Sequence, residues 1–348
     1  MKKNIAVVGY GGQGGWHVGH ALKSDVVSLA GIYDIDPAKI EKAKANGVYA
    51  YESFDALIAD EKVDIVVCAT PNDVHKEIVV KALSAGKNVI CEKPVEMSTA
   101  AFDEMVAAAE KNGKLFSVHQ NRRWDVDFIA IKEIIASGEI GETINIESRI
   151  HGSRGIPSDW RCQKAHGGGM ILDWGVHLID QMLQLIPEKI ESIFCEITNI
   201  TTNEVDDGFK LVIKFESGKR GYVEVGTYNF IAMPRFYMQS KKGSAMIEDW
   251  RREAEIAYCK AWNEKEVVPV QTAAGITKTM APRDEITLDT YTHARPVSDV
   301  HDFYRNIVKA IDGEEEQLIK NCEVRRVLRV METAFESAKE NKVIKVEI

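Results

Sequence analysis

The chain has 348 residues, of which 45% are hydrophobic and 28% charged, and its formal net charge is -9. This length suggests about two domains. An acidic balance without a basic cluster excludes nucleic-acid binding through phosphates, and no apolar run reaches the length of a membrane span. The six cysteines lack Cys-x-x-Cys spacing, and residues 1–8 are too short for a signal peptide. We therefore expect free thiols in a soluble, cytoplasmic protein.

Apolar strands alternate with helical segments from Lys3 to about Asn121. The predicted strands are Ile5–Val8, Val26–Tyr33, Val63–Ala69, Asn88–Cys91 and Leu115–Val118. Gly86 and Gly113 stand where helices should end. Continuous apolar strands alternating with helices indicate an α/β domain with a doubly wound parallel sheet, which we place at residues 1–121.

A glycine-rich turn, Gly-Tyr-Gly-Gly-Gln-Gly, lies between the first predicted strand and a helix. Asp34 follows twenty residues later, at the end of the second strand. This is the context of a dinucleotide-binding fingerprint, in which the backbone approaches a pyrophosphate and the acid accepts from a ribose diol. We assign coenzyme binding to Gly9, Gly11, Gly12, Gln13, Gly14 and Asp34. The alternative is a glycine-rich turn without a ligand.

Asp34 also indicates which dinucleotide binds. A carboxylate at this place repels the 2′-phosphate of NADP, and no arginine follows it closely, so NAD is predicted. Alternatively, Asp36 beside Pro37 caps a helix and Asp34 is a turn residue. Both roles can coexist.

Two further strand ends fall where a doubly wound sheet binds its ligand. The polar residues and prolines expected there, all assigned to the coenzyme, are Thr70, Pro71, Asn72, His75, Glu92 and Lys93. For Thr70, Asn72 and His75, loop and helix capping is an equal alternative. Pro94 favours an extended Lys93, whose ammonium can bind a substrate oxygen or help relay its proton, although a solvated charge is the usual fate of lysine.

The stretch 167–187 predicts a mostly buried helix after three glycines. Asp173, His177, Asp180 and Gln184 form one polar stripe on this apolar helix. Because Asp173 and His177 lie one turn apart, we expect them to share a hydrogen bond that prepares the imidazole for proton transfer. A structural histidine with satisfied hydrogen bonds is the main alternative.

The pattern beyond residue 121 predicts a second, sheet-dominated α+β domain at 122–348. Its predicted elements are a helix at 128–136, a strand at 143–151, successive antiparallel strands at 190–200, 209–215, 221–228, 236–240 and 245–248, and closing helices at 298–311 and 322–341. Residues 271–295 lack clear periodicity.

Four motifs together resemble the Gfo/Idh/MocA oxidoreductases over nearly the whole chain. They are Gly9-x-Gly11-x-x-Gly14, Glu92-Lys93-Pro94, Asn121-Arg122-Arg123 and Asp173-x-Gly175-x-His177. The resemblance implies a Rossmann domain followed by a large open, mostly antiparallel sheet that mediates homodimers or homotetramers. It also implies that Lys93, Asp173 and His177 are the catalytic set, and that the substrates are sugars, inositols or related polyols. Trp124, Val126, Trp174 and Val176 stand at positions where this chain departs from the family's commoner residues or where the motif varies.

The sequence thus predicts an NAD-dependent oxidoreductase acting on CH–OH groups, without a metal. The residues expected to bind substrate are Asn121, Arg122, Trp160, Arg161, Asp173 and His177. One alternative is an enzyme that keeps its NAD and uses transient oxidation to cleave or eliminate a glycosidic group. A second is a nucleotide-sensing module without chemistry, although binding NAD requires none of the three catalytic residues.

Overall fold

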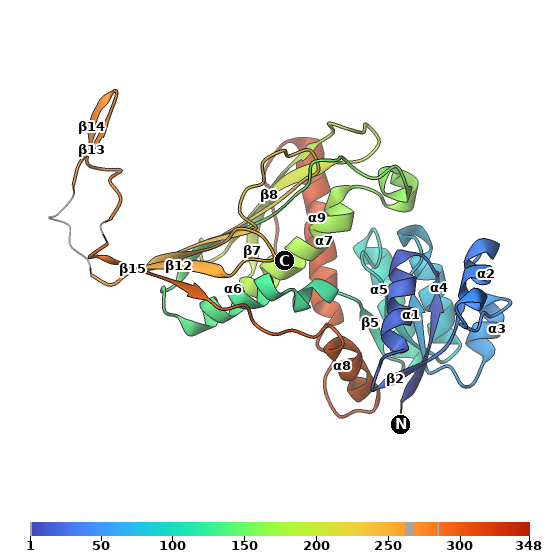
Figure 1. The fold of residues 1–348 in the computed structure, drawn as a ribbon. Coiled ribbons are helices and arrows are strands. Elements are labelled where there is room, and N and C mark those ends of the chain that lie inside the picture. The colour runs from blue at the N-terminus through green and yellow to red at the C-terminus, as the bar shows by residue number, and fades with distance from the viewer. Residues whose placement is uncertain (1, 262–267, 284) are drawn as a thin grey trace.

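The computed structural model describes residues 2–261, 268–283 and 285–348, which form two lobes (Figure 1). The first lobe has a five-stranded parallel sheet in the order β2-β1-β3-β4-β5. Its strands are β1 (Lys3–Val8), β2 (Val27–Tyr33), β3 (Ile65–Cys68), β4 (Asn88–Cys91) and β5 (Phe116–Val118). The predicted doubly wound sheet is confirmed, with no strand end displaced by more than two residues.

Five helices connect these strands. They are α1 (Gly12–Ala21), α2 (Pro37–Ala45), α3 (Phe54–Ala59), α4 (His75–Ser84) and α5 (Thr99–Asn112). Gly113 ends α5 in the left-handed conformation, with φ of 59°, as its sequence position predicts. The apolar strands β3 and β4 are almost completely buried, which fits a sheet covered on both faces.

The second lobe contains a nine-stranded sheet in the order β15-β12-β11-β10-β6-β9-β8-β7-β16. Its strands are β6 (Thr143–His151), β7 (Ile190–Thr198), β8 (Gly208–Phe215), β9 (Arg220–Gly226), β10 (Phe236–Ser240), β11 (Gly243–Ile247), β12 (Ala254–Cys259), β15 (Leu288–His293) and β16 (Ile344–Lys345). The predicted mostly antiparallel sheet is confirmed, and the parallel pair among its described strands is β6 with β9. Strands β12 and β15 were not predicted.

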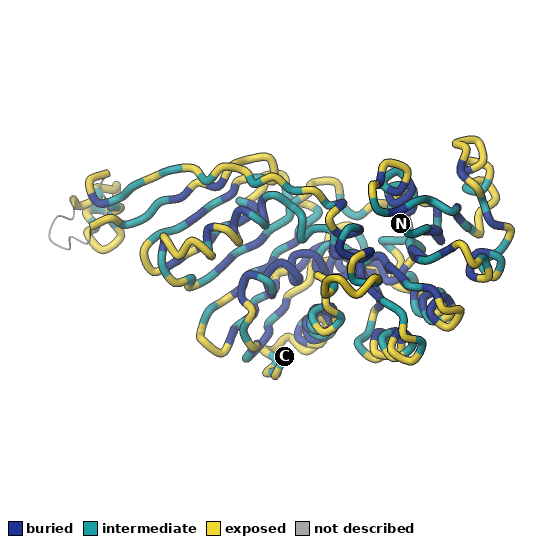
Figure 2. The backbone as a smooth tube through the Cα atoms, turned by 90° about the horizontal axis from the view of Figure 1, so that it is seen from below, coloured by how far each residue is buried: buried dark blue, intermediate teal, exposed yellow. Residues whose placement is uncertain are grey.

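Helices cover one face of this large sheet (Figure 1). They are α6 (Val126–Ser137), α7 (Val176–Leu185) and α9 (Asn321–Glu340), whereas α8 (Asp302–Ile311) lies beside the first lobe. Helix α7 contacts α6, α9, β6 and β9, and every residue of it except Gln184 is buried. Figure 2 shows the buried residues gathered along the two sheets and the sides of the helices that face them. A helix held this firmly can fix the side chains at its first turn.

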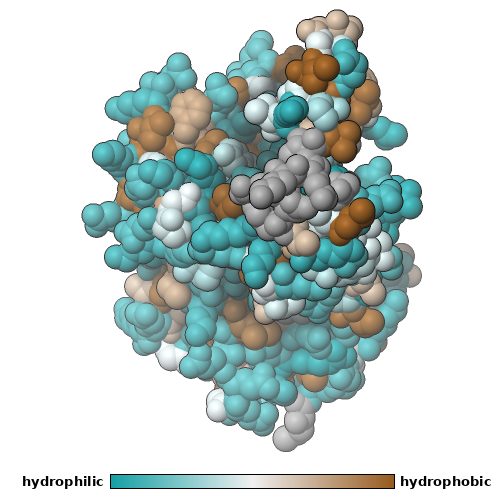
Figure 3. All heavy atoms as spheres, turned by 90° about the vertical axis from the view of Figure 1, so that its left-hand side faces the viewer, coloured by the Kyte–Doolittle hydropathy of each residue, from teal (hydrophilic) through white to brown (hydrophobic). Residues whose placement is uncertain are grey.

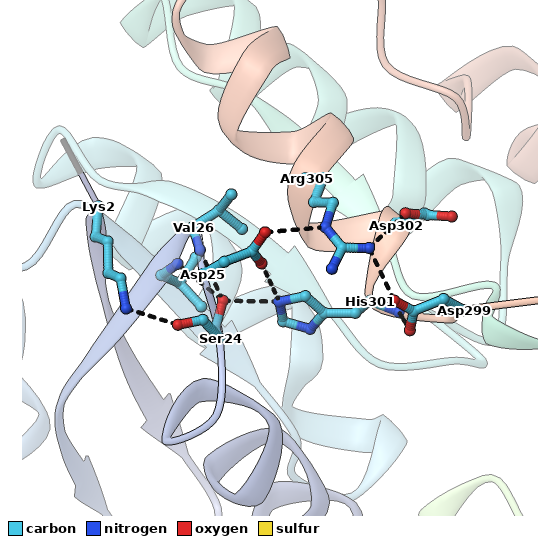
Figure 4. Close-up of polar contacts among 9 residues, drawn as sticks. Lys2, Ser24, Asp25, Val26, Asp299, His301, Asp302 and Arg305 are labelled. Atoms are coloured by element: carbon cyan, nitrogen blue, oxygen red, sulfur yellow. Dashed lines mark hydrogen bonds and ion pairs between the residues drawn. The ribbon is translucent and has the colours of Figure 1, made fainter.

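Helix α8 returns the chain to the first lobe through polar contacts (Figure 4). His301 Nε2 and Ser24 Oγ are 2.7 Å apart, and Arg305 Nε donates to Asp25 Oδ2 at 3.3 Å. Helix α9 also contacts both lobes, through α5 and β5 on one side and α7 and β7 on the other. The two lobes are therefore joined by more than the segment that first crosses between them.

The β13 (Val270–Thr272) and β14 (Gly275–Thr277) hairpin extends from the far end of the large sheet (Figure 1). Viewed from that side, the surface is mostly hydrophilic with separate hydrophobic groups (Figure 3). Within the described part of the chain, no helix combines the length and hydropathy that a bilayer crossing requires.

Candidate active site

A cavity of about 760 Å³ lies between the two lobes. The first lobe contributes the start of α1 and the segment after β4, and the second contributes the start of α7 and the ends of β6 and β9. Six residues predicted to serve catalysis or substrate binding line it: Lys93, Asn121, Arg122, Arg161, Asp173 and His177. The structure therefore brings together side chains that are widely separated in the sequence.

Lys93 reaches across the cavity from the first lobe. It follows β4 by two residues, and its peptide bond to Pro94 is cis. Its Nζ donates to Asp173 Oδ1 at 3.2 Å and to the main-chain oxygen of Asp173 at 3.1 Å. The predicted projection of this ammonium toward the ligand side of the sheet is what the structure shows.

Asp173 lies in a π-helical turn, Ile171–Gly175, that leads into α7. Its second carboxylate oxygen accepts from Arg161 Nε at 3.3 Å. Burial raises the pKa of Asp173, but the charges of Lys93 and Arg161 lower it further, so the net shift is downward. The predicted hydrogen bond between Asp173 and His177 is wrong: two cations compete for the carboxylate and bind it instead.

His177 occupies the first turn of α7 and is 4% exposed. Its Nδ1 is buried and has no hydrogen-bond partner among the described residues. Burial, followed by the positive charges of Lys93 and Arg122, places the pKa of His177 well below its usual value. The imidazole is therefore neutral near pH 7 and can accept a proton.

The rest of the polar stripe serves packing. Asp180 binds Arg123 through two hydrogen bonds, Nη2 to Oδ1 at 2.6 Å and Nε to Oδ2 at 2.8 Å. Gln184 is partly exposed and does not line the cavity. Only the N-terminal part of the stripe faces the ligand space, because α7 leaves the cavity after one turn.

The glycine turn fits a coenzyme phosphate. Gly12 begins α1, and a Cβ added at Gly11 or Gly12 would meet nothing within 4 Å. A Cβ at Gly14 would lie 1.8 Å from the main-chain oxygen of Gly9, which packs α1 closely against the turn. Open space at a helix N-terminus is the arrangement that binds a pyrophosphate. Gly12 and Gln13 also line the cavity, so this turn and Lys93 border one space.

Asp34 and Asp36 take the turn and helix-cap roles considered for them from the sequence. Asp34 Oδ2 accepts from Tyr10 N at 2.6 Å, and its Oδ1 accepts from Asp36 N at 2.8 Å. Asp36 caps α2 by accepting from Ala38 N at 2.9 Å. Asp34 thus fixes the turn and remains half-buried at the end of β2, where a ribose would lie.

Two residues assigned to the coenzyme, His75 and Glu92, have side chains that are enclosed in the protein. The ring of His75 is fully buried, with Nε2 2.9 Å from the Thr70 oxygen and Nδ1 3.2 Å from the Pro94 oxygen. Glu92 Oε1 accepts from His17 Nε2 at 2.7 Å and from His119 Nδ1 at 2.8 Å. Both side chains hold strand ends in place, because their polar atoms are already engaged inside the fold.

The other assigned positions at these strand ends differ in exposure. Asn72 is 2% exposed and donates through Nδ2 to the Gly167 oxygen at 3.1 Å, a structural contact between the two lobes that caps no helix. Thr70 is half-buried and Pro71 exposed at the end of β3. These two remain open to a ligand.

The aromatic wall of the cavity was assigned to the wrong tryptophan. Trp160 does not line the cavity, and its ring packs under the Arg161 guanidinium at 4.6 Å. Trp174 and Trp250 line it instead, and Arg122 stacks on them at 4.2 and 5.7 Å. Trp174 could have been identified from its place beside Asp173. Trp250 lies between β11 and β12 and carries no sequence signal.

Comparisons with known proteins agree with this geometry. Residues 3–120 match the model described as "Oxidoreductase family, NAD-binding Rossmann fold", and residues 128–246 match the GFO/IDH/MocA C-terminal domain. The structure of an NAD-binding protein from Listeria innocua is similar over 99% of both chains, with a TM-score of 0.96 and 44% identity.

Two curated relatives show how far the similarity extends. An uncharacterized oxidoreductase of Schizosaccharomyces pombe is 37% identical over 186 residues, which are 51% of this chain; the match spans only 50% of that protein's length. The scyllo-inositol 2-dehydrogenase (NADP(+)) IolW of Bacillus subtilis is 26% identical over 99% of this chain and 96% of its own.

Proposed function

The chain belongs to the Gfo/Idh/MocA family of NAD-binding oxidoreductases, and from this we propose that it transfers hydride between NAD and a ring hydroxyl or ketone of a sugar, inositol or related polyol. The observation that carries the proposal is the meeting of Lys93, Asp173 and His177 at a cavity that also reaches the start of α1. Binding a dinucleotide requires none of these three side chains, whereas moving a proton requires groups of their kind.

When bound, the nicotinamide coenzyme takes hydride from the carbinol carbon in one direction and returns it in the other. His177, which lines the cavity, accepts the hydroxyl proton on its imidazole ring. Lys93 donates a hydrogen bond to the oxygen as negative charge develops there. Asp173 holds the Lys93 ammonium in place, which replaces the role of orienting His177 that the sequence suggested.

We propose NAD over NADP because Asp34 presents a carboxylate at the end of β2. The relative from Bacillus subtilis is named as NADP(+)-dependent, so coenzyme choice is tested on this chain directly. We further propose a cytoplasmic homodimer or homotetramer formed through the large sheet. Analytical ultracentrifugation tests the oligomer, and a monomer at micromolar concentration would contradict it.

The test of function follows two signals in one reaction. Purified protein is incubated with NAD and a panel of inositols, aldoses and glycosides while nicotinamide absorbance and product mass are recorded together. We expect NADH to accumulate in step with a product two hydrogens lighter. Product formed without net NADH would support the coenzyme-retaining alternative, and neither signal would contradict both.

A further inference from the structure

The candidate active-site cavity has an excess of cationic side chains. Lys93, Arg122, Arg154 and Arg161 line it, and Asp173 is the one carboxylate among its described lining residues. This excess is local, because the whole chain carries a net charge of -9. A neutral polyol does not require it.

Three of the four cations have carboxylate partners. Lys93 pairs with Asp173 at 3.2 Å, Arg122 Nη1 donates to Asp125 at 3.0 Å, and Arg161 Nη1 donates to Asp159 at 2.9 Å. Arg154 differs: over residues 2–261, 268–283 and 285–348, it has neither an ion pair nor a hydrogen bond from its side chain. Its guanidinium is the cation left without a counter-charge beside the ligand space.

The backbone around Arg154 is held by main-chain bonds. Arg154 follows β6 by three residues, and the loop is tied to the end of β9 on both sides. Gly152 N donates to the Gly226 oxygen at 2.8 Å, and Gly155 N donates to the Thr227 oxygen at 2.8 Å. Arg154 thus belongs to the second-lobe wall, whereas the glycine turn that fits the coenzyme phosphates lies on the first-lobe wall. The Arg154 guanidinium, unpaired among the described residues, is therefore on the second-lobe wall of the cavity, away from the glycine turn of the first lobe.

Arg122 and Asn121 add polar side chains to the cavity wall. Cationic and amide groups therefore line the same space as the catalytic residues.

We propose that the substrate carries one anionic group, a carboxylate or a phosphate monoester, that Arg154 binds. The substrate class is then a sugar acid or a sugar or cyclitol phosphate, and a neutral polyol is the poorer substrate. Arg154 is exposed at the cavity wall, and a guanidinium binds either group through two parallel hydrogen bonds. This inference rests on the proposed function, because it assigns a substrate to the same site.

The test compares matched neutral and anionic probes: glucose with glucuronate and with glucose 6-phosphate, galactose with galacturonate, and myo-inositol with inositol 1-phosphate. We expect at least one anionic member to exceed its neutral partner in kcat/KM by about 10- to 100-fold, the effect of one hydrogen-bonded charge. Comparing the uronates with the phosphates tells which anion is preferred. Arg154→Gln should lower kcat/KM for the anionic member to about that of its neutral partner. Arg220→Gln, an exposed arginine at the opposite end of β9, is the matched control and should change neither.

Two outcomes separate this inference from the proposed function. If neutral members are oxidised as well as anionic ones, or if Arg154→Gln weakens NAD instead, the inference is overturned while the enzyme remains. If no probe is oxidised, the binding of neutral and anionic probes to the NAD-loaded protein is compared instead. The readout is the fluorescence of Trp174 and Trp250, which line the cavity. Anion binding that Arg154→Gln abolishes supports the inference even then, and equal or absent binding of both probe types overturns it.

Discussion

Replacing His177 tests the proton-transfer step most directly. Its Nδ1 is the buried, unpartnered atom of the cavity helix, and its lowered pKa keeps the ring neutral. A positioned general base contributes about 10²–10⁴ to rate. His177→Ala should therefore lower kcat by that factor, which corresponds to about 3–5 kcal/mol in the activation barrier. His177→Gln keeps more of the side-chain volume but supplies no base, so it should lose a similar amount.

The assay must separate chemistry from binding and folding. NAD affinity should change little in both variants, since the glycine turn and Asp34 lie on the first lobe. A substrate carrying deuterium on the carbinol carbon should show whether hydride transfer limits turnover in each variant. Gln184→Ala is the matched control, because Gln184 lies on the same helix but does not line the cavity.

The pH profile gives a second readout. Burial and the charges of Lys93 and Arg122 lower the pKa of His177, so the basic form persists below the usual histidine range. We expect the wild-type kcat/KM to remain level from about pH 8 to about pH 6, because His177 stays in its basic form over this range. The variants lack this base, so the residual kcat/KM that they show should not follow the titration of His177. Turnover of His177→Ala within about threefold of wild type, or an equal loss in Gln184→Ala, would refute the assignment of the base.

Three other changes test the coenzyme turn and the support of the catalytic helix. Asp34→Asn keeps an acceptor for Tyr10 N but removes the charge, so kcat/KM should fall about tenfold with NAD and rise with NADP; a wild-type protein that prefers NADP contradicts this. Gly14→Ala should lower the free energy of unfolding by about 1–3 kcal/mol and weaken NAD binding, because the added Cβ would clash with the Gly9 oxygen. Gly15→Ala is the control, since a Cβ there meets open space and should not destabilise the fold. Urea titrations compare the unfolding free energies of the two variants. Burial raises the pKa of Asp206 from 3.8 to about 7, so the native state binds a proton that the unfolded state releases, and stability should fall by up to about 3 kcal/mol from pH 5 to pH 8. Asp206→Asn should flatten that slope in urea unfolding, and an unchanged slope assigns it to other groups.

Periodicity and turn chemistry were sufficient to predict most of the fold. Continuous apolar strands predicted the first sheet because both of its faces are covered. Strands β12 and β15 were missed because their side chains alternate only weakly between buried and exposed positions; β15 is the edge strand of the second sheet and β12 is its neighbour. The parallel pairing of β6 with β9 depends on where the chain re-enters the sheet, which local pattern does not encode.

The candidate site was predictable where a motif fixes both residue type and backbone position. Lys93, Asp173 and His177 reach one cavity for this reason. The motif could not predict which neighbouring side chain each of these residues binds in the folded protein. The i, i+4 spacing suggested that Asp173 binds His177, but cations from the other lobe and from the 160s loop lie nearer to its oxygens. A long-range ion pair thus replaced the local hydrogen bond.

At the end of β4, the motif likewise did not predict which partners the adjacent side chains of Glu92 and Lys93 would bind. Successive side chains of an extended segment point to opposite sides, so one of two adjacent charges must turn away from the ligand. Glu92 turns inward to His17 and His119, and its Oε2 accepts from Lys93 N at 3.2 Å. The pKa of Glu92 is lowered well below its usual value, because the charge and hydrogen bonds of His119 and His17 outweigh burial, so the carboxylate stays ionised. The buried glutamate therefore anchors the peptide from which Lys93 extends, and the motif serves the site through one side chain in the core and one in the cavity.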